Sequence, residues 1–147
     1  MKTPAKFIAD WLASQAAVSA VQLGTFGGTE DWSLWVAVEP PEDGDGSQDG
    51  VPANVVTLYD TGGPPPDTDE QDVFGSTFQV RVRSTDYQNG YVKSVEIRKA
   101  LLRLSSVLDG ETRYETVRQV SDIMFIGRDD KDRYLLTSNY QVIRQEN

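Results

Sequence analysis

Cysteine and histidine are both absent from this chain of 147 residues. Without cysteine the protein has no disulfide framework and no thiolate nucleophile, and without histidine it lacks the commonest general base and metal ligand. Ser-His-Asp triads and zinc sites are therefore excluded. These absences favour a structural or binding protein over an enzyme, and we expect no catalytic residues, no metal and no cofactor.

Long apolar runs are also missing. No stretch of about 18 apolar residues, the length that a membrane-spanning helix needs, occurs in the chain. Near the N-terminus, Asp10 and Trp11 stand where a signal peptide would hold an unbroken apolar stretch. We therefore expect a soluble protein made in the cytoplasm with no membrane partner, folded as a single domain over 1–147.

Basic residues are scarce in the first half of the chain. Residues 1–80 hold 2 basic and 13 acidic side chains, whereas residues 81–147 hold 12 basic and 10 acidic, so the net charges are −11 and +2 and sum to −9. Ten carboxylates and six of the seven prolines lie within 39–72. We expect mobile acidic loops near 40–52 and 60–74, because these stretches have too few apolar groups to order themselves. Such a surface repels phosphate, so tight binding of free nucleic acid is not expected.

Apolar residues with a helical period indicate two helices. Pro4 favours a helix start, and apolar spacings of four and seven predict a helix over about 4–19. The period returns over about 86–108, where Ser84 or Asp86 is able to cap the first turn.

Alternating apolar residues between turn signals predict the strands. The first two strands look like a hairpin, and residues 128–132 are expected at the tip of another. Because strands and helices do not alternate regularly, the order favours an α+β fold, with an antiparallel or mixed β-sheet and both helices packed on one face. The predicted strands are 21–26, 32–38, 54–59, 78–83, 114–120, 123–127 and 134–143.

Within the strand over 78–83, apolar residues alternate with a polar stripe. The stripe consists of Gln79, Arg81 and Arg83. Because successive side chains of a strand point to opposite faces, this strand has one apolar and one basic face. The stripe is suited to binding an anion, to facing solvent or to meeting a protein, since arginine is enriched at interfaces.

Two further residues are candidates for an interface. Trp35 stands at opposite parity to Trp32 in one strand, so both cannot enter the same core. Arg98 lies inside the apolar arc of the second helix, so it either pairs with a carboxylate or marks a second contact surface. The predicted interface residues are therefore Trp35, Gln79, Arg81, Arg83 and Arg98.

The acidic loops hold one candidate cation site. Residues 45–50 match the first half of a calcium loop, with oxygen side chains at alternate positions and a glycine at the sixth. Position twelve is Val56 instead of a bidentate glutamate, so we favour a solvated acidic loop. The carboxylate pair Asp129-Asp130 is likewise expected to be solvated at an exposed tip.

Three segments together resemble a known family. They are VVTLYDTGG at 55–63, FQVRVR at 78–83 and the helix end ALL at 100–102. Over about 53–108 the chain resembles the small minor capsid or tail terminator proteins of long-tailed bacteriophages. The first helix and the closing hairpin are consistent with that family.

The resemblance implies a structural virion protein, assembled in the host cytoplasm, that forms a homohexameric ring. The ring would cap the head-proximal end of the tail tube and join it to the head connector. Its partners would be further copies of itself, the tail tube protein and the head-tail connector protein, with DNA passing through the channel without tight binding. A wide apolar helix arc and tryptophans on both faces of one strand suit a ring, in which each subunit needs two different complementary patches.

One alternative of another class remains open. An acidic regulator that imitates DNA would bind a basic host protein directly through the carboxylates of 39–72.

Overall fold

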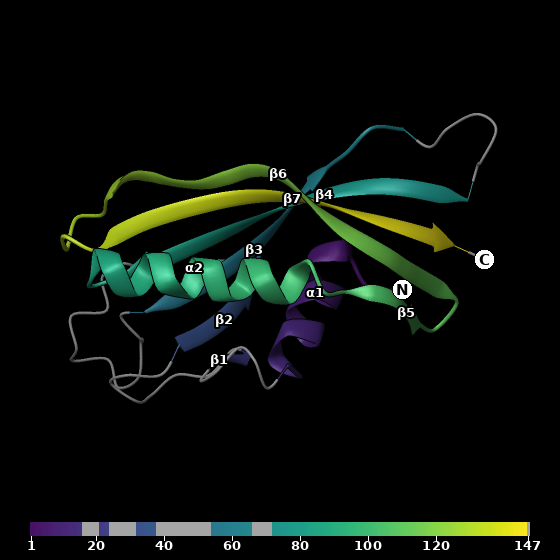
Figure 1. Ribbon diagram of the computed structural model, residues 1–147, viewed down its shortest axis with the longest axis horizontal. Coiled ribbons are helices and arrows are strands. Elements are labelled where there is room, and N and C mark those ends of the chain that lie inside the picture. The colour runs from purple at the N-terminus through teal and green to yellow at the C-terminus, as the bar shows by residue number, and fades with distance from the viewer. Residues whose placement is uncertain (16–20, 24–31, 38–53, 66–71, 147) are drawn as a thin grey trace.

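A computed structural model describes residues 1–15, 21–23, 32–37, 54–65 and 72–146 (Figure 1). The described strands form one mixed sheet in the order β1-β2-β3-β4-β7-β6-β5. The elements are α1 (Pro4–Ala13), β1 (Val21–Leu23), β2 (Trp32–Val36), β3 (Val55–Gly62), β4 (Val73–Ser84), α2 (Tyr87–Leu101), β5 (Ser105–Asp109), β6 (Thr112–Arg128) and β7 (Tyr134–Glu146).

Both helices pack on one face of this sheet (Figure 1), which confirms the predicted α+β class. Buried side chains of α1 and α2 join those of the central strands in one apolar cluster. Within it the ring of Phe7 stacks on Tyr114, with centroids 3.5 Å apart. The core thus lies between the helices and the sheet and leaves the opposite face of the sheet for polar residues.

The first helix is shorter than expected. Thr3 caps it through its Oγ1, which accepts from the Lys6 N–H at 3.2 Å, and Pro4 occupies the first turn as predicted. The helix ends at Ala13 instead of about residue 19, because the N–H and hydroxyl of Ser14 both bind the carbonyl of Trp11 and close the last turn. Residues 16–20 lie outside the described part.

The second helix also ends early. The Asp86 carboxylate accepts from the Gln88 N–H at 3.2 Å, which confirms the predicted cap. The helix ends at Leu101, and the residues expected to continue it to Leu108 form a turn at 102–103 and, from Ser105, β5. Two serines open β5, and serine is a weak helix former because its hydroxyl competes for backbone groups.

The pairing of β1 with β2 corrects the expected hairpin. The two strands are parallel, with Val21 opposite Trp32. Alternation of apolar residues sets which face a strand buries, but it carries no information on strand direction. β3 is parallel to β2, and the remaining pairs are antiparallel.

One long strand replaces two predicted ones at the end of the chain. β6 runs without interruption through residues 121–122, where the sequence pattern predicts a break between two strands. Its register against β7 shifts at four places, so bulges there disturb the alternation from which strands are recognised. The tip over 128–132 connects β6 to β7, as predicted.

Candidate assembly surfaces

The face of the sheet opposite the helices carries a cross-strand row, here called the polar row. Register places Trp35 opposite Thr57, Thr57 opposite Arg81, and Arg81 opposite Thr137. The row therefore crosses β2, β3, β4 and β7 in order. Residues directly opposite each other in a sheet have adjacent side chains, so the row is continuous. Trp35 and Arg81 are half-buried, whereas Thr57 and Thr137 are buried.

Polar contacts connect the residues of this face. The Arg81 guanidinium lies 5.8 Å from the centroid of the Tyr59 ring. The Gln79 side chain donates to Asn139 Oδ1 at 3.4 Å, and Trp35 Nε1 donates to Ser33 Oγ at 2.8 Å. Three of the predicted interface residues thus share a face on which side chains already interact.

Arg83 and Arg98, the other two predicted interface residues, differ from these three in burial or in position. Arg83 shares the face but is fully buried, so it is not an open contact residue in the described structure. Arg98 projects from α2 on the other side of the sheet and pairs with Asp122 of β6 at 3.3 Å. Of the two options for Arg98, pairing with a carboxylate is the observed one.

Sequence patterns missed an exposed apolar surface. Four large apolar side chains of β6 are between 42% and 62% exposed. They follow one another within a short stretch that contains a single charge, Asp122. The low charge of this stretch was the signal from which the apolar surface could have been predicted. The sequence pattern instead divides the stretch between two short strands, so its apolar residues were not considered together. The four are Val120, Met124, Phe125 and Ile126.

An aromatic cluster extends this surface onto α2. The Tyr87 ring meets the rings of Phe125 and Tyr134 edge-on, each at 5.7 Å between centroids. Arg128 lies over the Tyr134 ring at 4.7 Å. The cluster joins the N-terminus of α2 to the β6–β7 hairpin near its tip.

At that tip, Asp129 corrects a prediction, because it is buried and not solvated. Its carboxylate binds the Arg133 guanidinium at 2.7 Å and accepts the N–H groups of Lys131 and Arg133. Burial opposes ionisation of Asp129, but these donors outweigh it and hold its pKa below the ordinary value. The carboxylate therefore organises the tip.

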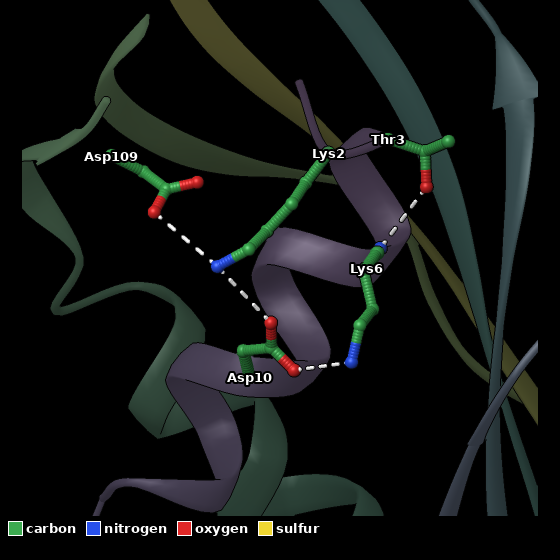
Figure 2. Close-up of polar contacts among 5 residues, drawn as sticks. All are labelled: Lys2, Thr3, Lys6, Asp10 and Asp109. Carbon is green, nitrogen blue, oxygen red and sulfur yellow. Dashed lines mark hydrogen bonds and ion pairs between the residues drawn. The ribbon is translucent and has the colours of Figure 1, made fainter. Parts of the chain in front are cut away.

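A second polar network ties the N-terminus to β5 (Figure 2). Lys2 Nζ lies 3.2 Å from Asp10 and 3.3 Å from Asp109, and Lys6 binds the other oxygen of Asp10 at 2.7 Å. Hydrogen bonds to Asp10 and Asp109 raise the pKa of Lys2. A pocket beside this network is lined by Lys2, Asp109, Glu111 and neighbouring residues.

Within the described residues, no group of three or more acidic side chains is placed to hold a metal ion. No helix in that part of the chain is long and apolar enough to cross a membrane. The calcium-loop candidate at 45–50 and most of the acidic loops lie outside the described residues.

Comparison with known proteins gives the class. The family model described as "Bacteriophage tail terminator protein" matches residues 18–146. The fold is similar to that of a chain in the virion of a native gene transfer agent particle, with a TM-score of 0.59 and 12% identity over 94% of this chain and 91% of that one. No curated protein matches the chain.

The protein is thus a structural protein of bacteriophage virions. The chain belongs to the bacteriophage tail terminator family, as its resemblance to that family implied.

Proposed function

We propose that the protein forms a ring that caps the head-proximal end of the tail tube and joins it to the head connector. The observation that carries this proposal, beside family membership, is the presence of two unlike surfaces on one sheet. The polar row offers the half-buried side chains of Arg81 and Trp35, whereas β6 offers exposed apolar side chains. A closed ring needs two different patches on each subunit, because every interface is heterologous.

The proposal assigns assembly, and not catalysis, as the activity. A hexamer is the ring that family resemblance suggests, with the tail tube protein on one side and the connector protein on the other. Trp35, Gln79, Arg81 and Arg98 remain our candidates for contacts between proteins. The acidity of 39–72 suits a rim or channel through which DNA passes without sticking, because like charges repel.

The experiment compares the purified protein alone and with purified tail tubes. Light scattering should show either an oligomer of the size of a ring or a monomer that assembles into such an oligomer when tail tubes are added. Electron micrographs should show added density at a single end of each tube. A protein that stays monomeric in the presence of tubes, and leaves both tube ends bare, contradicts the proposal.

A further inference from the structure

Most of β6 forms an open edge of the sheet. β5 pairs with β6 only as far as Thr116, so residues 117–128, here called the edge segment, pair with β7 alone among the described strands. The N–H and C=O groups on the outer side of such a strand are a template for another strand. In Figure 1 the edge segment follows the outer margin of the sheet toward the β6–β7 tip.

The composition of the edge segment is unusual for an edge left in water. Between residues 120 and 126 it has one charged side chain and four exposed large apolar ones. Edge strands that stay open are normally protected by charge, proline or short length. Here only the bulges interrupt the ladder, and they limit indiscriminate pairing without covering the apolar side chains.

Among the described strands, β1 is the edge at the opposite end of the sheet. β1 pairs only with β2 among the described strands. The two edges lie at opposite ends of the strand order, with β2, β3, β4 and β7 between β1 and the edge segment of β6. A strand added to either edge would extend the sheet.

The two ends of the sheet differ in charge. No Lys or Arg occurs between Lys6 and Arg81, a stretch that supplies β1, β2 and β3. The other end carries exposed charges of both signs, among them Lys99, Arg118, Glu111 and Asp122. Two copies of the acidic end therefore repel each other, whereas the acidic end of one copy is not repelled by the mixed end of another.

We propose that the edge segment of one subunit pairs with the β1 edge of a second copy of this chain, so that the sheets of neighbouring subunits run on into each other. This inference rests on the proposed ring function and assigns its subunit interface. Pairing of unlike edges is heterologous, and repetition of it closes a ring when the rotation between copies allows. Met124 lies opposite Thr137, so it continues the polar row to the edge of the sheet. The row therefore lies next to the proposed subunit interface.

Site-directed cross-linking tests the pairing, because the natural chain has no cysteine. Two cysteines are introduced into one chain, Gln22→Cys in β1 and Val120→Cys in the edge segment, and the assembled protein is treated with a short bis-maleimide. We expect a ladder of covalent multimers up to the full ring. Each single variant alone should stay a monomer on a denaturing gel.

A matched control separates the edge from exposed apolar surface in general. Leu102 is 50% exposed but lies at the end of α2, so Gln22→Cys with Leu102→Cys should give no ladder. Quantitative dimers from Val120→Cys alone would show that two edge segments pair with each other, which overturns the proposal. An oligomer that forms normally but gives no ladder also overturns it and leaves the ring function standing.

Charge at the edge gives a second measurement. Met124→Lys should weaken assembly at least about tenfold, because an edge lysine opposes strand addition. Leu102→Lys should leave assembly unchanged, and both variants should keep the thermal midpoint of the monomer. If Met124→Lys assembles as well as the natural protein, the edge pairing is contradicted. If the natural protein does not assemble, with tubes or without, the ring function itself is contradicted.

Discussion

At the scale of single residues, burial decides which ion pairs contribute to the stability of the fold. Asp129 and Arg98 each form an ion pair, but the two pairs differ in burial. The Asp129 side chain is 1% exposed and pairs with an Arg133 that is 6% exposed. The partner of Arg98, Asp122, is 82% exposed. A pair inside the protein loses much when one partner is removed, whereas a solvated pair loses little.

We predict that Asp129→Asn lowers the free energy of unfolding by about 3 kcal/mol near neutral pH, because it leaves a buried guanidinium without this carboxylate. The folded-state pKa of Asp129 lies below the unfolded value, so its stabilisation is present above about pH 4 and is lost as the pH falls through the folded pKa. Urea denaturation from neutral to acidic pH measures this. The two proteins should converge in stability on acidification, and a constant difference across that range would show that the charge of Asp129 is not responsible.

We predict that Arg98→Ala changes the free energy of unfolding by less than about 1 kcal/mol, because its ion pair is largely solvated. The denaturation midpoint provides the measurement. Asp122→Ala is the matched variant and should behave alike. A loss of several kcal/mol in either would mean that the pair is shielded from water.

At the scale of elements, α1 is held by its buried apolar face and by two specific contacts. The Ala5 N–H donates to Asp60 Oδ1 of β3 at 2.8 Å, and Phe7 stacks on Tyr114 of β6. The helix thereby joins strands from both halves of the sheet. Because α1 is short, these contacts, and not its own hydrogen bonds, supply most of its stability.

We predict that Phe7→Ala costs about 4 kcal/mol of unfolding free energy, since it removes a buried ring and leaves a cavity. Phe7→Leu keeps most of the volume and loses the stacking, so it should cost about 1 kcal/mol. Thermal or urea denaturation of the two variants makes the comparison. Equal, small losses would show that the helix is not anchored through this ring.

The elements also show how far sequence patterns reach. Side-chain periodicity placed both helices, the Asp86 cap and the two-faced strand β4, because burial on one face leaves a direct trace in the sequence. It did not give the parallel direction of β1, the end of α2 or the unbroken course of β6. Strand direction depends on contacts distant in sequence, and bulges remove the alternation that marks a strand. The sequence did not relate Trp35 to Gln79 and Arg81, although the strand register places all three on one face, and the apolar edge segment was not foreseen.

At the scale of the whole molecule, charge is divided between the two halves of the chain. If the acidity of 39–72 only decorates the ring, replacing residues 42–49 by a short Gly-Ser turn should leave folding and oligomer size unchanged, because the closure entropy of a loop changes only slowly with its length. Circular dichroism and light scattering measure both. Loss of tube binding with folding intact would instead assign the acidic segment a direct contact, and strong salt dependence of that binding would favour charge mimicry.

Electron microscopy of tail tubes incubated with the purified protein tests the central proposal most directly. We predict a ring of identical subunits at one end of each tube, and no further growth when free tube protein is added. The matched sample contains Met124→Lys protein, which should leave most tube ends bare. Tubes that remain bare and continue to elongate in the presence of the natural protein would contradict its function as a terminator.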